Sequence, residues 1–382
     1  MTDTPAPHYP FLDLGRVNQP FMGDLQQAAL RVVRSGRYIG GEEVERLEYE
    51  LATLHQAPFA VAVANGLDAL RLSLRAAVIT GRLREGDKVM VPANTYIASV
   101  LAITDAGLAP LLVDPDENTM CLTGEIVAGH ITPDVKALMP VHLYGRVAWD
   151  TLMAETAMRH GLWVIEDGAQ SIGATAAVPG LYGSRRSAAL GHAGALSFYP
   201  TKNVGALGDA GAVITHDPEL ARTVRALANY GCDRRYHNIL QGFNSRLDPI
   251  QAAMLRVKLH YLESINADRF ALATAYHNTI DNPRVTKPVM SGSVTDCVWH
   301  QYVIGCEHRD ELRAYLAAHG VETDIHYPIP PHMQPCYCDL PHGSLPITES
   351  LAGRIISLPI APGCTSVSDA AAISQIINQF NP

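Results

Sequence analysis

The sequence predicts an α/β fold in which helices cover both faces of a mostly parallel β-sheet. The main observation is that strand-like apolar runs alternate with segments of helical spacing from residue 59 to residue 229. The length of 382 residues suits two domains, or one large domain with an appendage. The composition, 47% hydrophobic and 18% charged, is typical of a globular protein with a large core.

The expected elements follow one another in a regular order. Two helices precede the sheet, at 22–34 and 42–54, where apolar residues recur at helical spacing. The predicted strands are the apolar runs at 59–64, 87–92, 109–114, 136–143, 161–167, 194–198 and 211–215. The predicted helices among them are 66–78, 95–105, 149–159 and 217–229.

The pattern changes near residue 247. A long helical stretch, RLDPIQAAMLRVKLHYLESINADRFALATAYHNTI, is followed by a mixed α+β tail with clustered prolines. We therefore expect a large domain over 1–247 and a smaller α+β C-terminal domain over 248–382. The Pro- and His-rich loop at 323–346 is long for a connector, and such loops are often functional.

Charge and hydropathy exclude several classes of partner. The net charge is −9, with 38 acidic and 29 basic residues, so nucleic acid is not expected. The first residues lack a signal pattern, and no apolar run reaches the eighteen or more residues of a membrane span, so we expect a cytoplasmic protein without a membrane partner. Seven scattered cysteines include one CxC pair, Cys336 and Cys338, with three histidines nearby but no ligand template; we expect reduced thiols and no metal.

Three features point to chemistry at the carboxyl ends of the predicted strands, where such sheets bind ligands. Asp167 ends a strongly apolar strand; by itself it reads as a cap or an ion pair, but it could also face a protonated ring nitrogen. Asn65 and Gly66 join a strand to a helix whose N-terminus suits a phosphate, a weak signal because such junctions are common. Gln170 follows Asp167 closely and faces the same crevice.

Lys202 supplies the third feature. It follows the strand that carries Ser197, and a loop lysine is most often simply solvated. It can act as a Schiff-base lysine if burial lowers its pKa from about 10.4, because only the neutral amine attacks an aldehyde. An amine nucleophile, a carboxylate for a pyridinium and a phosphate cradle are together what pyridoxal 5'-phosphate (PLP) requires.

With these residues in view, the sequence resembles the DegT/DnrJ/EryC1/StrS family of sugar-nucleotide aminotransferases. The resemblance covers nearly the whole chain, and its blocks occur in family order. They read FLDLGRVNQPF, SGRYIGGEEVERLE, VPANTYIAS, PVHLYG, EDGAQSIGA, SFYPTKNVGALGDAGAV, GFNSRLDPIQAA and IHYPIPPHMQP. The family implies an aspartate aminotransferase (type I) fold and a PLP cofactor that cycles through pyridoxamine 5'-phosphate (PMP).

The resemblance implies catalytic roles for three residues. Lys202 would bond covalently to the cofactor aldehyde and later carry a proton, Asp167 would keep the pyridine nitrogen protonated, and Gln170 would approach the phenolic oxygen. Tyr96 would stack on the ring.

The resemblance also implies how the phosphate is held. Gly66, Leu67 and Ser197 would bind it, and Asn244 would reach it from the other subunit of a homodimer. The sequence departs from the commoner SGT turn, because Asn65, Gly66 and Leu67 stand there; the backbone amides or Asn65 would have to replace the lost hydroxyl.

The subfamily resemblance predicts the reaction. Segments such as ANGLDAL and YHNILQGFNSRLDPIQAA are similar to the 3-aminotransferases of dTDP-3-keto-6-deoxyhexoses, with L-glutamate as amino donor and deoxyamino sugars as products. His326 and Tyr327, in the loop that resembles the family's substrate-facing segment, are expected to contact the nucleotide sugar. The alternatives are a sugar-nucleotide 4-aminotransferase, a UDP-3-keto-uronate 3-aminotransferase, or a PLP-binding homologue without catalysis.

Overall fold

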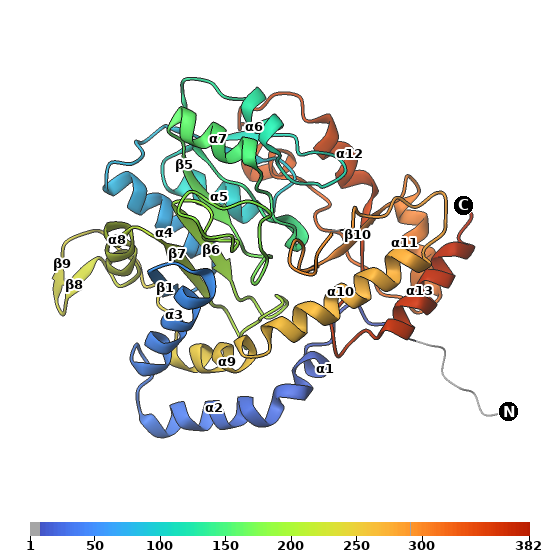
Figure 1. The fold of residues 1–382 in the computed structure, drawn as a ribbon, viewed down its shortest axis with the longest axis horizontal. Coiled ribbons are helices and arrows are strands. Elements are labelled where there is room, and N and C mark those ends of the chain that lie inside the picture. The colour runs from blue at the N-terminus through green and yellow to red at the C-terminus, as the bar shows by residue number, and fades with distance from the viewer. Residues whose placement is uncertain (1–7, 291) are drawn as a thin grey trace.

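A seven-stranded β-sheet forms the centre of the chain, whose computed structural model describes residues 8–290 and 292–382 (Figure 1). The sheet order is β1-β7-β6-β5-β4-β2-β3. Its strands are β1 Phe59–Val63, β2 Lys88–Pro92, β3 Ala109–Val113, β4 Val135–Leu138, β5 Trp163–Asp167, β6 Ala193–Ser197 and β7 Gly211–Thr215. β7 runs antiparallel to β1 and β6, and the other neighbours pair in parallel, so the predicted mostly parallel sheet is confirmed.

Helices cover both faces of this sheet, because the strand side chains alternate between two buried layers. On one face, α4 Gly66–Ile79, α5 Ile97–Asp105 and α8 Pro218–Ala228 pack on strand residues such as Val61, Val91 and Ile165. The other face is covered at one end by α3 Glu42–His55 and α9 Pro249–Leu259, and at the other end by α6 Gly124–Gly129 and α7 Thr151–His160.

A second apolar core lies beside the sheet. It is built on α10 Leu262–Thr279, α11 Arg309–Ala318, α13 Val367–Gln379 and the two-stranded pair β10 Tyr302–Gly305 and β11 Ile355–Leu358. The helical stretch predicted at 246–280 is two helices, because the chain leaves helical geometry at Tyr261 (φ −100°, ψ 7°). α9 packs against α2 Met22–Ser35 and α3, whereas α10 packs against α13. The expected boundary at 247/248 stays a prediction.

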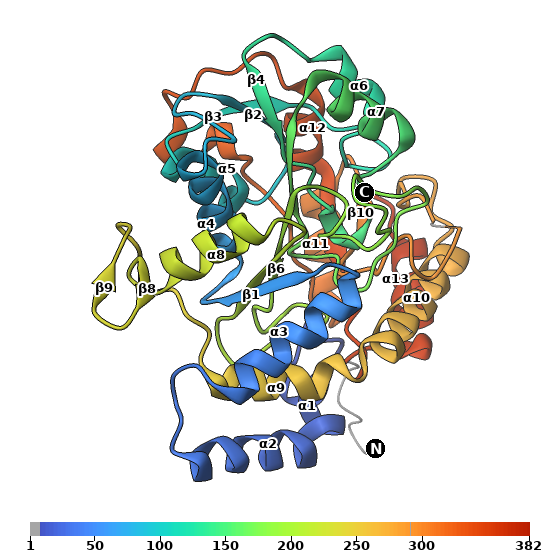
Figure 2. The ribbon, with the colours of Figure 1, turned by 60° about the vertical axis from the view of Figure 1, so that its left-hand side comes forward.

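The remaining elements lie at the periphery. They are α1 Leu14–Asn18, α12 Pro346–Arg354, and the hairpin of β8 Cys232–Arg234 and β9 His237–Asn238. The hairpin projects away from the body in both ribbon views (Figures 1 and 2). Among the residues described, no helix combines the length and the apolar character that crossing a bilayer requires.

Candidate active site

A cavity of about 520 Å³ opens at the carboxyl ends of the strands. Loops after β1, β2, β5 and β6 enclose it from the sheet side, and residues from the second core enclose it from the other. The predicted residues on its wall are Asn65, Gly66, Leu67, Tyr96, Asp167, Gln170, Ser197, Lys202, His326 and Tyr327. The volume lies within the usual range for small-molecule sites.

Lys202 presents its amine to this cavity. Its backbone N–H donates to the Tyr199 carbonyl at 2.9 Å, which closes the turn after β6. In the described part of the chain, no side chain or carbonyl bonds to Nζ. Burial lowers the pKa of Lys202 to about 8, and the Asp167 carboxylate acts in the opposite direction. A useful fraction of the amine is therefore neutral near physiological pH, as a nucleophile requires.

Asp167 is a buried carboxylate at the end of β5, with 6% of its surface exposed. Oδ2 accepts a hydrogen bond from Ser99 Oγ at 2.6 Å, and Oδ1 accepts one from the Ala169 N–H at 3.1 Å. Within 4 Å, none of the basic side chains that the structure describes pairs with it. A buried carboxylate with two neutral donors and no cation suits a positively charged ligand group.

The N-terminus of α4 forms a second polar corner of the cavity. Asn65 caps the helix, because its Oδ1 accepts from the Asp68 N–H at 2.8 Å, so the first-turn amides of Gly66 and Leu67 keep their hydrogens for a ligand. Gly66 approaches Ser197 so closely that a Cβ at this position would lie 2.5 Å from Ser197 Cβ. Two amides and one hydroxyl thus converge, as a phosphate site requires.

Gly66→Ala is expected to weaken cofactor binding by at least about tenfold, because the new methyl group must push α4 or Ser197 away. We expect the free energy of unfolding to fall by about 1–3 kcal/mol. Fluorescence titration of the apoprotein with PLP, together with urea unfolding, measures both effects.

Gly353→Ala is the matched control. Gly353 lies in α12, and a Cβ there would have no atom within 4 Å. We expect unchanged cofactor binding and a stability equal to, or up to about 1 kcal/mol above, that of the parent chain. Equal PLP affinities in the two variants would contradict the phosphate corner.

Gln170 and two tyrosines line the wall opposite α4. Gln170 Oε1 accepts from the Tyr144 N–H at 2.5 Å, and Nε2 donates to the Tyr327 hydroxyl at 3.1 Å. The rings of Tyr96 and Tyr327 lie 4.9 Å apart and are tilted. Burial, aided by the Asp167 charge, raises the pKa of Tyr327, so the phenol stays neutral.

His326 is held from two sides at the cavity edge. Its Nδ1 lies 2.8 Å from Ser357 Oγ, and its ring stacks on Phe11 with centroids 5.9 Å apart. Burial lowers the pKa of His326, while nearby Asp324 raises it. The Tyr144 hydroxyl donates to the His326 carbonyl, which fixes the loop that carries both predicted substrate residues.

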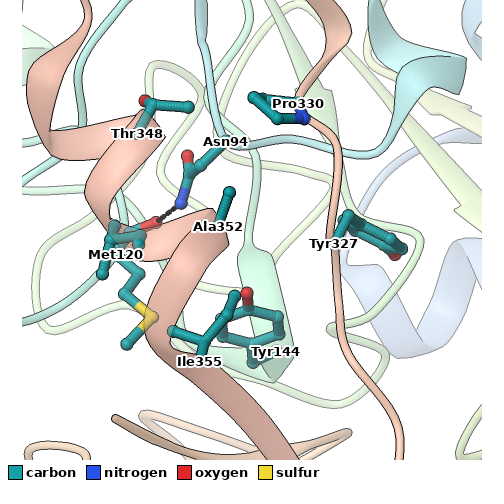
Figure 3. A pocket seen from close by; sticks show the side chains of 9 residues that line it. Asn94, Met120, Tyr144, Tyr327, Pro330, Thr348, Ala352 and Ile355 are labelled. Carbon is teal, nitrogen blue, oxygen red and sulfur yellow. Dashed lines mark hydrogen bonds between the residues drawn. The ribbon is translucent and has the colours of Figure 1, made fainter. Parts of the chain in front are cut away.

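Figure 3 shows a separate pocket behind Tyr327, between the β2–α5 loop and α12. Asn94 donates there to the Met120 carbonyl at 2.9 Å, and Tyr144 and Thr348 complete the wall. It offers room of only about 10 Å³, less than a sugar or a cofactor needs. The candidate site is therefore the larger cavity.

Two further residues lie outside this cavity, one of them the predicted Asn244. Asn244 is exposed and does not line the cavity of its own chain. His332, in the same loop as His326, is buried off the cavity and faces Glu349 at 3.4 Å. Over 8–290 and 292–382, no three His, Cys, Asp or Glu side chains are arranged to hold a metal ion.

The structure adds cavity residues that sequence reasoning missed. Among the polar ones they are Thr95, His142, Tyr199, Thr201, Asp209, His300 and Gln301. Thr95 Oγ1 lies 2.7 Å from Ser99 Oγ and so extends the hydrogen bonds of Asp167. In the sequence, HQYVI at 300–304 resembles the start of a core strand. The only signal for His300 and Gln301 as cavity residues was that they form a polar pair directly before an apolar run.

The donor set fits PLP. The corner at Gly66 and Ser197 suits its phosphate, the unpaired carboxylate of Asp167 suits a protonated ring nitrogen, and the unpaired amine of Lys202 suits its aldehyde. All of these groups face one cavity.

Comparison with known proteins identifies the family and the fold. The model of the DegT/DnrJ/EryC1/StrS aminotransferase family matches residues 22–379. The chain is 45% identical to dTDP-3-amino-3,4,6-trideoxy-alpha-D-glucose transaminase of Streptomyces venezuelae, over 94% of this chain and 92% of the relative. It is 42% identical to dTDP-3-amino-3,6-dideoxy-alpha-D-galactopyranose transaminase of Aneurinibacillus thermoaerophilus, over 97% and 99%.

Two solved structures have the same architecture. The crystal structure of DesV from S. venezuelae in complex with a ketimine intermediate superposes with a TM-score of 0.90 at 43% identity and covers 98% of both chains. NtdA from Bacillus subtilis, with bound cofactor PMP, gives a TM-score of 0.87 at 29% identity and covers 99% of this chain and 87% of its own.

Proposed function

The chain belongs to the DegT/DnrJ/EryC1/StrS aminotransferase family, and on this premise we propose that it transfers an amino group from L-glutamate to C3 of a dTDP-3-keto-6-deoxyhexose. The products are 2-oxoglutarate and the dTDP-3-amino sugar. Two groups that line one cavity support the reaction type. They are the amine of Lys202 and the buried carboxylate of Asp167, and neither forms an ion pair with a described residue. Supporting the sugar are the two transaminases at 42% and 45% identity, whose names share the dTDP-3-amino sugar.

The cofactor we propose is PLP, which alternates with PMP. When bound, it supplies an aldehyde carbon that accepts the amino group and a ring that withdraws electrons from the bond being broken. The first-turn amides of Gly66 and Leu67 and the Ser197 hydroxyl would hold its phosphate, with Asn65 fixing the turn. Tyr96 would cover one face of the ring.

Three side chains then perform the chemistry. Lys202 Nζ would tether the cofactor, and as a free amine it would take the proton from the α-carbon of glutamate and, in the second half-reaction, deliver a proton to C3 of the sugar. Asp167 keeps a positive charge on the pyridine nitrogen, because its own charge has no other cation. Gln170, fixed by Tyr144 and Tyr327, presents its amide beside Asp167 for the phenolic oxygen.

His326 and Tyr327 are the residues we propose for the sugar. Both lie on the cavity wall, on a loop that the Tyr144 hydroxyl anchors, and the Tyr327 ring lies 4.9 Å from that of Tyr96. The neutral forms of both side chains suit hydrogen bonds to sugar hydroxyls.

The reaction is tested with a panel of dTDP- and UDP-linked 3-keto and 4-keto sugars, L-glutamate and added PLP. We expect turnover of a dTDP-3-keto-6-deoxyhexose, with the new amine located at C3 by NMR. Amination at C4, or a clear preference for a UDP-linked uronate, would instead establish one of the two alternative aminotransferases.

The pH dependence of cofactor uptake follows from the lowered pKa of Lys202. Only the neutral amine attacks the aldehyde, so below about pH 8 the uptake rate should rise almost tenfold per pH unit, and above it the rate should level off. Stopped-flow absorbance of the apoprotein mixed with PLP between about pH 6 and 10 measures this, with free lysine and PLP as the reference. A midpoint near the ordinary lysine value would contradict burial as the activating factor.

We propose a homodimer in which Asn244 of one chain completes the site of the other. Asn244 is exposed and off its own cavity, which such sharing requires. In heterodimers of a Lys202→Ala chain and an Asn244→Ala chain, one site regains both residues, so we expect about half of the parent activity per dimer. Activity no higher than that of the Asn244→Ala homodimer would place Asn244 in its own chain's site or outside both.

A further inference from the structure

A buried hydrogen-bond network follows Lys202 directly in the chain. Asn203 is 8% exposed, and its Nδ2 donates to Asn266 Oδ1 and to the Val298 carbonyl, each at 2.9 Å. Asn266 Nδ2 in turn donates to the Ile172 carbonyl at 3.0 Å. The proposed mechanism uses none of these groups.

This network fixes the tautomer of His300. Both Asn203 amide hydrogens go to carbonyl oxygens, so Asn203 Oδ1 can only accept, and its partner is His300 Nδ1 at 3.2 Å. Nδ1 must therefore carry the ring proton, which leaves a lone pair on Nε2. In water the imidazole is free to exchange between tautomers; here the protein selects one.

The lone pair of His300 belongs to the cavity wall. His300 is 5% exposed, lines the same cavity as Lys202, and its Nε2 bonds to no described residue. Burial holds the pKa of His300 well below its usual value, and the positive charges of Lys202 and Arg269 lower it further. The ring therefore stays neutral, and Nε2 remains an acceptor across the working pH range.

The backbone around His300 is held as firmly as its ring. Buried Arg269 donates from Nη1 to the carbonyls of Trp299 and His300, each at 3.1 Å. On the other side Gly145, at φ +97°, lies so close that a Cβ there would be 2.9 Å from the His300 nitrogen. Such fixed surroundings are typical of a side chain that positions another group.

We propose that His300 is a positioning residue for Lys202: both line one cavity, neither Lys202 Nζ nor His300 Nε2 has a hydrogen-bond partner among the described residues, and a rotation of the lysine side chain would let its free amine donate to the Nε2 lone pair that the Asn203–Asn266 network fixes. This orients the amine so that its own lone pair faces the substrate carbon rather than the cavity wall. We assign Lys202 as the donor because, among the cavity residues described, it alone carries an ammonium group. The role rests on the proposed function of Lys202 as proton carrier.

The tautomer and the bond are tested without turnover, in apoprotein labelled with nitrogen-15 at histidine. The His300→Gln variant identifies the His300 signals. We expect a protonated Nδ1 and an unprotonated Nε2 whose signal moves with a midpoint near pH 8, as Lys202 loses its proton. In Lys202→Met the Nε2 signal should stay constant. A proton on Nε2, or a titration that persists in Lys202→Met, would overturn the proposal.

The kinetic test uses the pH profile of PLP uptake and of the half-reaction with L-glutamate. His300→Phe removes the acceptor that favours the ammonium form, so the midpoint of uptake should move down by about 0.5 to 1 pH unit. The half-reaction rate should fall by about 10- to 100-fold, with little change in KM for glutamate. His300→Gln, which keeps a donor for Asn203 and an acceptor for Lys202, should recover most of the rate.

His55→Phe controls for the loss of a buried histidine. His55 is fully buried, bonds to the Ser187 carbonyl at 2.8 Å and lies off the cavity. We expect it to lower stability without moving the midpoint. A slower His300→Phe protein with an unmoved midpoint would show a structural role only. If the protein proves to act on a sugar other than a dTDP-3-keto-6-deoxyhexose, the NMR and uptake results still decide the role of His300.

Discussion

Replacing Lys202 by alanine is expected to lower the rate of the half-reaction with L-glutamate by at least about 10⁴-fold, because one atom provides both the covalent tether and the proton carrier. Nζ faces the cavity with no partner among the residues that the structure describes, and burial brings its pKa to about 8. Borohydride treatment of the parent protein with PLP should fix one cofactor per chain on the peptide that contains Lys202, as read by mass spectrometry. The Lys202→Ala protein should carry no such label.

Lys258→Ala is the control that separates position from pKa. Burial also lowers the pKa of Lys258 to about 8, but its Nζ donates to the Gly205 carbonyl at 2.7 Å and lies off the cavity. We expect this variant to lose about 1–3 kcal/mol of stability and to keep the borohydride label. A label that remained in Lys202→Ala and disappeared in Lys258→Ala would show that Lys258, and not Lys202, is the nucleophile.

Asp167→Asn is expected to have the second largest effect, a fall of about 10²- to 10⁴-fold in kcat. The amide keeps the size of the side chain and removes the charge that stabilises a protonated ring nitrogen. The same charge raises the pKa of Lys202, so the midpoint of PLP uptake should move below that of the parent protein. Steady-state kinetics and stopped-flow uptake measure the two effects independently.

Ser99→Ala tests the hydrogen bonds of the Asp167 carboxylate separately from its charge. Ser99 Oγ donates to Asp167 Oδ2 at 2.6 Å, and its loss leaves the Asp167 carboxyl in place with the Ala169 N–H still bonded. We expect a fall of about tenfold or less in kcat. If Ser99→Ala and Asp167→Asn were equally impaired, the geometry of the carboxylate rather than its charge would be decisive.

The strand–helix alternation of the sequence predicted which residues line the candidate cavity, because that alternation follows local chemistry. All seven strands of the sheet overlap the apolar runs expected from the sequence, and α4, α5, α7 and α8 overlap the expected helices. Residues that directly follow strands then had to meet at one edge of the sheet. Asp167, Ser197 and Lys202 do line one cavity there.

Neighbouring acidic residues show the limit of that reasoning. Glu166 and Asp167 end the same strand, and alternation places them on opposite faces. Glu166 is fully buried and accepts from the N–H groups of Ala188, Leu190 and Gly191 at 2.7–2.8 Å, and its Oε2 lies 2.9 Å from His142 Nε2. Its partners are far away in sequence, so only the folded chain shows that Glu166 accepts from protein donors at both oxygens, whereas Asp167 accepts two hydrogen bonds and lines the cavity.

The sequence by itself determined the α/β fold and the family, and it predicted which residues supply the amine, the carboxylate and the phosphate turn, since each depends on a local pattern or on blocks in a fixed order. Only the tertiary structure decided that Asn65 serves as a cap, that His332 and Asn244 lie off the cavity, and that His300 joins it. The physical reason is that burial, tautomer and hydrogen-bond partners depend on contacts between residues about a hundred positions apart, such as Asn203 and His300, and no local spacing encodes them.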